Sequence, residues 1–185
     1  MSEAQHQERS LSDWLKALGS GDETTWQEAA QALRRLGPAA VPELIKALGD
    51  EEWQVRHRAA EVLGTIGPEA KAAVPALAAV LQAEDKYLRS QGATALGKLG
   101  REARDAVPAL TEALKDKDED VRRDAAAALG RIGPDARTAV AGLVELLKDG
   151  RKSVRRQALQ ALREIDPDEA VRRLDLWSRF RRWFG

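Results

Sequence analysis

The chain contains no cysteine, which excludes disulfides, thiolate chemistry and cysteine-based metal sites. Aromatic residues make up only 4% of the 185 residues, and the two histidines, His6 and His57, are too far apart in sequence to suggest a local pair of metal ligands. Long apolar runs are absent, and the segment MSEAQHQERS lacks the apolar core of a signal peptide. We therefore expect a cytoplasmic protein with no metal or other cofactor.

The chain also has no excess of positive or negative charge, because 30 lysines and arginines balance 30 aspartates and glutamates. Such a chain has no overall electrostatic field that would favour nucleic acid. Hydrophobic residues reach 43%, largely through alanine and leucine, a composition typical of helices. Any electrostatic recognition must therefore come from local patches.

What the sequence does contain is a repeat. Residues 107–133 hold two helix-period apolar patterns separated by a short polar turn. Related stretches begin at Val41, Val74 and Val140, so that four starts lie 33 residues apart. A similar copy at 11–37 precedes them, with a linker three residues shorter. A constant period of this length predicts a stacked array of helix pairs.

Glycine and proline punctuate each repeat. Gly133-Pro134 reads as a helix stop, with the glycine in a left-handed conformation and the proline preventing continuation. Gly64, Gly97 and Gly130 recur inside the second helices, where each costs about 1 kcal/mol relative to alanine. A cost that recurs in every unit predicts close helix packing at that point.

The second helix carries the pattern D-x5-R-x2-A-A-x-A-L-G-x-I-G. This pattern resembles the short HEAT-like repeats of phycobilisome-lyase-type HEAT proteins and of artificial α-helical binders based on them. The resemblance implies an all-α, right-handed α-solenoid (superhelix) of about five HEAT-like helix pairs plus a C-terminal capping helix. The expected divisions are a disordered segment 1–9 and one HEAT-like domain 10–185, with repeats at about 11–40, 41–73, 74–106, 107–139 and 140–170 and a cap at 171–185.

The resemblance also implies an aspartate–arginine ladder through the turns. Its members occupy two positions six residues apart, namely Asp50/Arg56, Asp116/Arg122 and Asp149/Arg155. An arginine spaced regularly from an aspartate is well suited to link the turns of adjacent repeats, so we expect a structural role. The third repeat departs from the pattern with Ala83, and the first departs further with Ser20 and Trp26.

No arrangement typical of catalysis is present: the sequence shows no nucleophile with a base, no metal cluster and no phosphate loop. The acidic run at 116–120 lacks the glycine and the distal glutamate of a calcium loop, and fits an N-capping turn better. His57 lies on the polar side of its helix without a second ligand. We therefore expect a protein that is not an enzyme and has no small-molecule substrate.

The second helices vary at their outward positions while their apolar positions hardly change. By resemblance these positions line a concave groove, and we predict that a protein or peptide partner binds there. The predicted contacts are Trp26, Trp53, His57, Tyr87, Gln91, Arg123 and Arg156. Tryptophan and tyrosine are frequent binding hot spots. The alternative is that Trp26 and Trp53 fold back to cover turn edges.

The C-terminal segment combines five arginines with one aspartate between residues 172 and 184, together with four aromatic residues. A basic aromatic helix can seal an open repeat end, dock on a partner, or lie on an anionic membrane. We expect sealing by Trp177 and Phe180, and contact with a partner, a membrane or a second copy by Trp183 and Phe184.

The leading functional hypothesis is a scaffold or adaptor without enzymatic activity. Two alternatives remain. The resemblance admits a bilin lyase or isomerase subunit, and the arginine-rich tail admits binding to anionic membranes or nucleic acid. The regular array also admits an engineered binder, although the uneven linker and the missing ladder members favour a natural origin.

Overall fold

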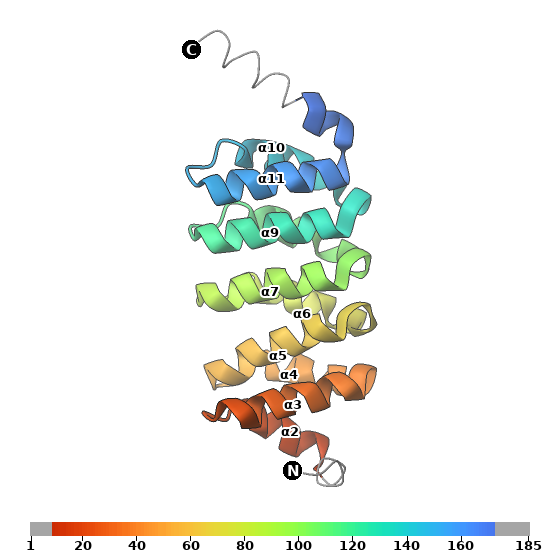
Figure 1. The fold of residues 1–185 in the computed structure, drawn as a ribbon, viewed down its shortest axis with the longest axis vertical. Coiled ribbons are helices and arrows are strands. Elements are labelled where there is room, and N and C mark those ends of the chain that lie inside the picture. The colour runs from red at the N-terminus through yellow and green to blue at the C-terminus, as the bar shows by residue number, and fades with distance from the viewer. Residues whose placement is uncertain (1–8, 173–185) are drawn as a thin grey trace.

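A computed structural model describes residues 9–172 as a stack of helix pairs (Figure 1). The first helices of the pairs are α2 (Leu11–Leu18), α4 (Val41–Ala47), α6 (Val74–Val80), α8 (Val107–Ala113) and α10 (Val140–Leu146). The second helices are α3 (Glu23–Leu36), α5 (Trp53–Ile66), α7 (Lys86–Leu99), α9 (Glu119–Ile132) and α11 (Lys152–Ile165). The predicted all-α solenoid is thus confirmed. Except for Arg9, the segment expected to be disordered falls outside the described residues.

Short 3₁₀ helices connect the repeats, where only linkers were expected from the sequence. They are η1 (Gly37–Ala40), η2 (Gly67–Ala73), η3 (Gly100–Ala106) and η4 (Gly133–Ala139). Consecutive members of this set pack against one another along the stack. Each of the three longer segments buries two alanines three residues apart, such as Ala103 and Ala106. That spacing matches three residues per turn and is the signal that could have predicted these helices.

The glycines that end α3, α5, α7 and α9 have a positive φ, as expected, but not the left-handed helical conformation. At Gly133 φ is 76° and ψ is −143°, and Gly67 is similar with φ 79° and ψ −145°. This region of backbone space is accessible essentially to glycine alone. The correction has a geometric reason, because the chain leaves an α-helix and enters a 3₁₀ helix at this single residue.

Replacing Gly133 with alanine should therefore lower the free energy of unfolding by about 2 kcal/mol through backbone strain alone. No atom lies within 4 Å of the Cβ that alanine would add there. Gly150 is a matched control, since its surroundings are equally open but its φ is ordinary. Urea denaturation followed by circular dichroism measures both variants. Equal stability of the Gly133→Ala and Gly150→Ala proteins would contradict the strain argument.

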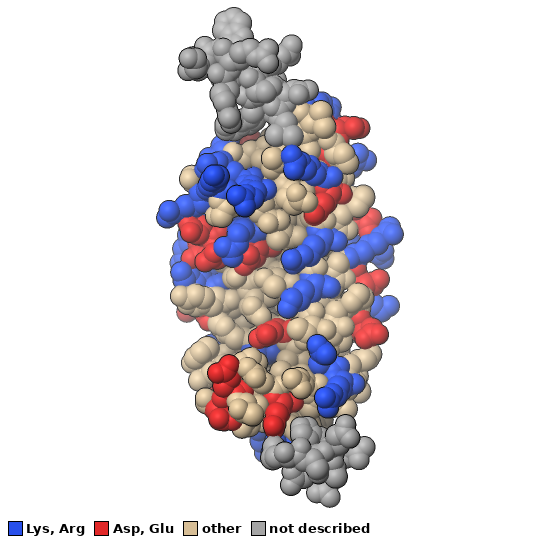
Figure 2. All heavy atoms as spheres, viewed as in Figure 1, with Lys and Arg blue, Asp and Glu red and all other residues tan. Residues whose placement is uncertain are grey.

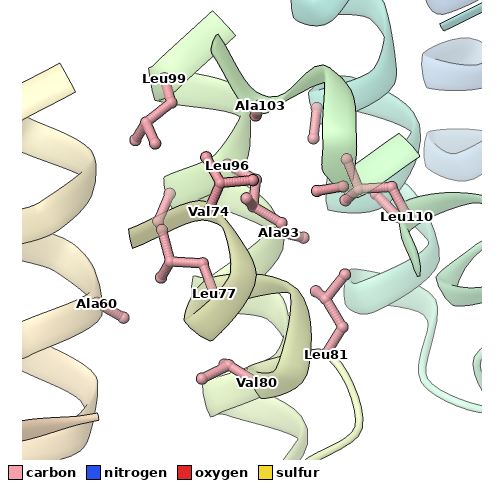
Figure 3. Packing of buried hydrophobic residues seen from close by; sticks show 14 of the residues in the cluster. Ala60, Val74, Leu77, Val80, Leu81, Ala93, Leu96, Leu99, Ala103 and Leu110 are labelled. Atoms are coloured by element: carbon pink, nitrogen blue, oxygen red, sulfur yellow. The ribbon is translucent and has the colours of Figure 1, made fainter. Parts of the chain in front are cut away.

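The hydrophobic core lies between the layer of first helices and the layer of second helices. The second helices form the front layer in Figure 1. Figure 3 shows this packing around the third repeat, where Leu77 of α6 and Leu96 of α7 are fully buried. Leu110 of α8, also fully buried, continues the core into the next repeat. Because this core runs unbroken through the stack, each repeat depends on its neighbours for burial.

Successive second helices touch at the recurring glycines. A Cβ on Gly64 would lie 2.9 Å from Cα of Ala95, and one on Gly97 would lie 3.0 Å from Cα of Ala128. Real Cβ atoms essentially never come as close as the first of these distances, and the second is tighter than nine in ten real Cβ contacts. The close packing predicted from these glycines is confirmed, and it sets the spacing between neighbouring second helices.

Candidate partner-binding surface

The outward side chains of α3, α5, α7, α9 and α11 form one broad surface, which we call the second-helix face. Figure 2 views this face from the same side as Figure 1. Acidic and basic side chains crowd together over α9 and α11, whereas uncharged residues cover much of the area over α5 and α7. The two halves of the face therefore offer different chemistry.

The less charged half contains two large exposed rings. Trp53 opens α5 and is 57% exposed, and Tyr87 is the second residue of α7 and is 67% exposed. His57 lies one helical turn after Trp53 and packs edge-on against its ring, with 5.5 Å between ring centroids. We call Trp53, His57 and Tyr87 the aromatic patch. The rings of Trp53 and Tyr87 are thus largely open to solvent at the starts of two neighbouring second helices.

Asp85 joins the two helices of the aromatic patch. Its Oδ2 lies 2.5 Å from Nε2 of His57, and its Oδ1 accepts the backbone N–H of Tyr87 at 2.9 Å. Burial alone would raise the pKa of Asp85, but these hydrogen bonds outweigh it and the pKa is lowered. An ionised carboxylate thus fixes the base of the patch while both large rings stay exposed.

Lys86 extends the aromatic patch toward α9. Its Nζ lies 5.1 Å from the centre of the Tyr87 ring and 2.9 Å from Oδ2 of Asp118. The hydrogen bond with Asp118 raises the pKa of Lys86 and keeps it charged. Asp118 also caps α9 by accepting the N–H of Asp120, which identifies the N-cap among the several acidic residues of that turn.

Trp26 differs from Trp53 and Tyr87 in its burial. It is half-buried beneath the guanidinium of Arg58, whose carbon lies 4.5 Å from the ring centre. Arg58 also donates to the carbonyl oxygens of Leu18 and Ser20. Trp26 therefore covers a turn edge in this structure, and a part for it in partner binding stays a prediction. Arg58 was not identified from the sequence, and it serves the first turn in place of the missing ladder arginine.

The other predicted contact residues differ in exposure and in how many of their side-chain groups are already hydrogen-bonded. Arg123 is half-buried, with its Nε donating to Oδ1 of Asp124 at 3.0 Å and a further bond to Asp120. Gln91 is half-buried on α7, and Arg156 is exposed on α11. Within residues 9–172 no carboxylate forms an ion pair with Arg156. Arg156 can therefore meet a partner more readily than Arg123 can.

The ladder joins the third repeat to the fourth and the fourth repeat to the fifth, always in the same direction. Nε and Nη2 of Arg89 donate to the two carboxylate oxygens of Asp116 at 2.7 and 2.9 Å. Arg122 contacts Asp149 in the same way, at 2.7 and 3.2 Å. The arginine of one repeat thus binds the aspartate of the following repeat, and the sequence signal for these pairs was the 27-residue interval between them.

Within one turn, the aspartate and the arginine six residues after it meet only through the main chain. Nη1 of Arg122 donates to the carbonyl of Asp116 at 2.8 Å, and Nη1 of Arg155 donates to the carbonyl of Asp149 at 2.6 Å. The reason is the fork of the guanidinium, since Nη1 reaches the arginine's own turn while Nε and Nη2 face the next one. Arg155 therefore stabilises the turn of its own repeat, whereas the carboxylate of Asp149 binds Arg122.

Comparison with known families identifies the repeat. A family model described as HEAT repeats matches residues 11–82 and 74–163. The chain belongs to the HEAT repeat family. The predicted relationship is thus confirmed, and no curated protein matches the chain.

Solved structures resemble this HEAT repeat protein in fold. An engineered protein is 27% identical with a TM-score of 0.61, and the alignment covers 84% of this chain and 79% of that one. The CpcE–CpcF complex of phycocyanin lyase from Nostoc sp. PCC7120 is 24% identical with a TM-score of 0.70, over 82% and 96%. A designed armadillo repeat protein in complex with the peptide (KR)4 is 18% identical with a TM-score of 0.63, over 89% and 87%.

The remaining predictions concern the C-terminal aromatic residues, metal binding and the membrane. Trp177, Phe180, Trp183 and Phe184 lie beyond the described residues, so their roles stay predictions. Within residues 9–172 no group of three or more histidines and carboxylates is placed to hold a metal ion. Across the same range, no helix has the length and apolar character needed to span a membrane.

Proposed function

We propose that this HEAT repeat protein is a scaffold without enzymatic activity that binds a protein or peptide on its second-helix face. The observation that carries the proposal is the aromatic patch, in which Trp53 and Tyr87 are more than half exposed on adjacent helices. Interfaces derive most of their binding energy from a few such residues. The contacts through His57 and Asp85 hold the patch in place before a partner arrives, which reduces the entropy lost on binding.

The fold supports an extended partner. The second helices lie side by side in one layer, so their outward residues repeat along the stack (Figure 1). One structural neighbour, a designed armadillo repeat protein, holds the peptide (KR)4. A solenoid of this kind can therefore accommodate an extended chain across several repeats.

Alanine at Trp53 and at Tyr87 should weaken partner binding at least about tenfold each, the loss expected for hot-spot aromatics. The partner is first isolated with the immobilised wild-type protein and purified, and its affinity is then measured by calorimetry. Lys152→Ala and Ser153→Ala are matched controls, because these residues occupy the equivalent positions at the start of α11. Circular dichroism checks that all four variants stay folded.

The location of the binding surface is tested by comparing the two pairs of variants. Unchanged affinity in the Trp53→Ala and Tyr87→Ala proteins, or an equal loss in the α11 controls, would contradict a site centred on the aromatic patch.

A second candidate function is that of a bilin lyase-type subunit. It is supported by the likeness in fold to the phycocyanin lyase complex, which extends over 96% of the matched chain. Mixing the protein with a bilin and an acceptor protein tests it directly. A change in visible absorbance with transfer of the bilin would favour this function over the scaffold.

A further inference from the structure

The ladder is incomplete between the second and third repeats. Nη1 of Arg56 donates to the carbonyls of Asp50 and Glu51 at 2.7 and 2.8 Å, as Arg89 Nη1 does in the next turn. Ala83, however, occupies the position that Asp116 holds one repeat later. Among the described residues no carboxylate lies within 4 Å of the Arg56 guanidinium. Nε and Nη2 of Arg56 therefore lack the carboxylate that Arg89 and Arg122 bind with these atoms.

A hollow lies beside these unused donors. It has a volume of about 770 Å³ and is lined by Arg56 and Ala83 together with apolar side chains of α6 and α7, including Val80 and Leu88. The equivalent hollow one repeat later, lined by Arg89 and Asp116, measures only about 330 Å³. The hollow is therefore larger at the turn that lacks the aspartate.

Three substitutions between the repeats account for the difference in size. Gly49, Ala79 and Ala83 line the larger hollow, and the equivalent positions 33 residues later carry longer side chains. Those side chains are Gln82, Glu112 and Asp116, all of which line the smaller hollow. Small residues thus open both the space for a ligand and the access to Arg56.

The charges around the hollow restrict what it can bind. A planar guanidinium with Nε and Nη2 free matches the two oxygens of one carboxylate. Glu84 and Asp85 also line the hollow, and Asp85 is already engaged by His57. These two carboxylates repel a multiply charged anion such as phosphate more strongly than they repel a single carboxylate. The alanine, valine and leucine side chains of the lining favour an apolar group attached to the ligand carboxylate.

We infer that Arg56 and this hollow form a binding site for a single carboxylate carried next to a small apolar group. The ligand carboxylate takes the place of the aspartate that the third repeat lacks. Such a group is present in an aspartate beside an apolar residue of another protein, and equally in a chain terminus that ends in an apolar residue. The inference stands without the proposed function, since it uses neither Trp53 nor Tyr87.

Nuclear magnetic resonance of the arginine Nε–H groups tests the site. The probes are acetyl-Leu-Asp-amide, whose only acid is a side chain, and acetyl-leucine, whose only acid is a terminal carboxylate. The neutral controls are acetyl-Leu-Asn-amide and acetyl-leucine amide. We expect at least one acid probe to shift the Arg56 Nε–H signal saturably, with at least about tenfold weaker binding of its neutral control. Arg89 and Arg122 should not respond, because Asp116 and Asp149 already bind them.

The substitution Ala83→Asp is the sharpest variant, because it supplies the missing carboxylate from within the chain. It should abolish the shift at Arg56 while the protein stays folded. The site would be overturned by absence of a saturable shift at Arg56, by equal shifts at all three arginines, by equal binding of acid and neutral probes, or by unchanged binding in the Ala83→Asp protein. The stronger of the two acid probes identifies whether a side chain or a chain terminus is preferred.

Discussion

Replacing Asp116 with alanine is expected to lower the free energy of unfolding by about 3–5 kcal/mol, the cost of leaving a buried charge without its partner. Arg89 is 5% exposed and would lose both of its hydrogen bonds to a carboxylate. Its remaining bonds go to the carbonyls of Ala83 and Glu84, which do not carry a compensating charge. Urea denaturation followed by circular dichroism measures the loss.

Asp50 provides a control for the turn itself. Its Oδ1 accepts the N–H of Glu52, just as Oδ1 of Asp116 accepts the N–H of Asp118. Asp50, however, pairs with no arginine of the first repeat, where Trp26 stands at the ladder position. The Asp50→Ala protein should lose only about 1 kcal/mol, the value of one exposed hydrogen bond. Similar losses in the two variants would show that the pair with Arg89 contributes little.

The pH dependence of this difference follows from the state of the carboxylate. Burial alone would raise the pKa of Asp116, but hydrogen bonds from Arg89 and from the N–H of Asp118 outweigh it and hold the pKa below 3.8. The stabilisation is therefore complete above about pH 4 and is lost as the pH falls through the lower pKa of the folded state. The gap in stability between the wild-type and Asp116→Ala proteins should narrow below about pH 4.

The starts of four of the first helices could be predicted from the sequence, because they depend on local chemistry. Val41, Val74, Val107 and Val140 begin the first helices in the structure as they do in the sequence pattern. Each of these helices carries an apolar stripe of period 3.6. Three of the four valines are followed by proline, which is favoured in the first turn of a helix. The 3₁₀ connections were missed, since short segments with few turns give only a weak periodic signal.

The candidate site could be predicted only in part, because contacts between repeats depend on how far neighbouring units are offset. The helical period places Trp53 on the outward side of α5, where it is 57% exposed. The same reasoning placed Trp26 beside it, but Arg58 comes from the next repeat and packs over that ring. The link from Arg89 to Asp116, and the missing partner of Arg56, likewise become evident only when two repeats are stacked.

Replacing Gly97 with valine is expected to lower the free energy of unfolding by about 3 kcal/mol, the upper range for overpacking a core. A Cβ added at this position would lie 3.0 Å from Cα and 3.2 Å from Cβ of Ala128 on the neighbouring α9. The two methyl groups of valine would have to enter the same contact, so α7 and α9 must separate. Such a separation disturbs the core on both sides, since each repeat is buried by its neighbours.

Lys98 controls for the cost of valine in the helix. It is the next residue of α7 but is exposed, so Lys98→Val should cost only a few tenths of a kcal/mol from helix propensity. Glycine is about 1 kcal/mol less favourable than alanine inside a helix and is also less favourable there than valine. Helix propensity alone would therefore make the Gly97→Val protein more stable than the wild-type protein. The sign of the change in urea midpoint therefore separates the two effects. A midpoint equal to or above that of the wild-type protein would show that neighbouring second helices do not depend on glycine for their approach.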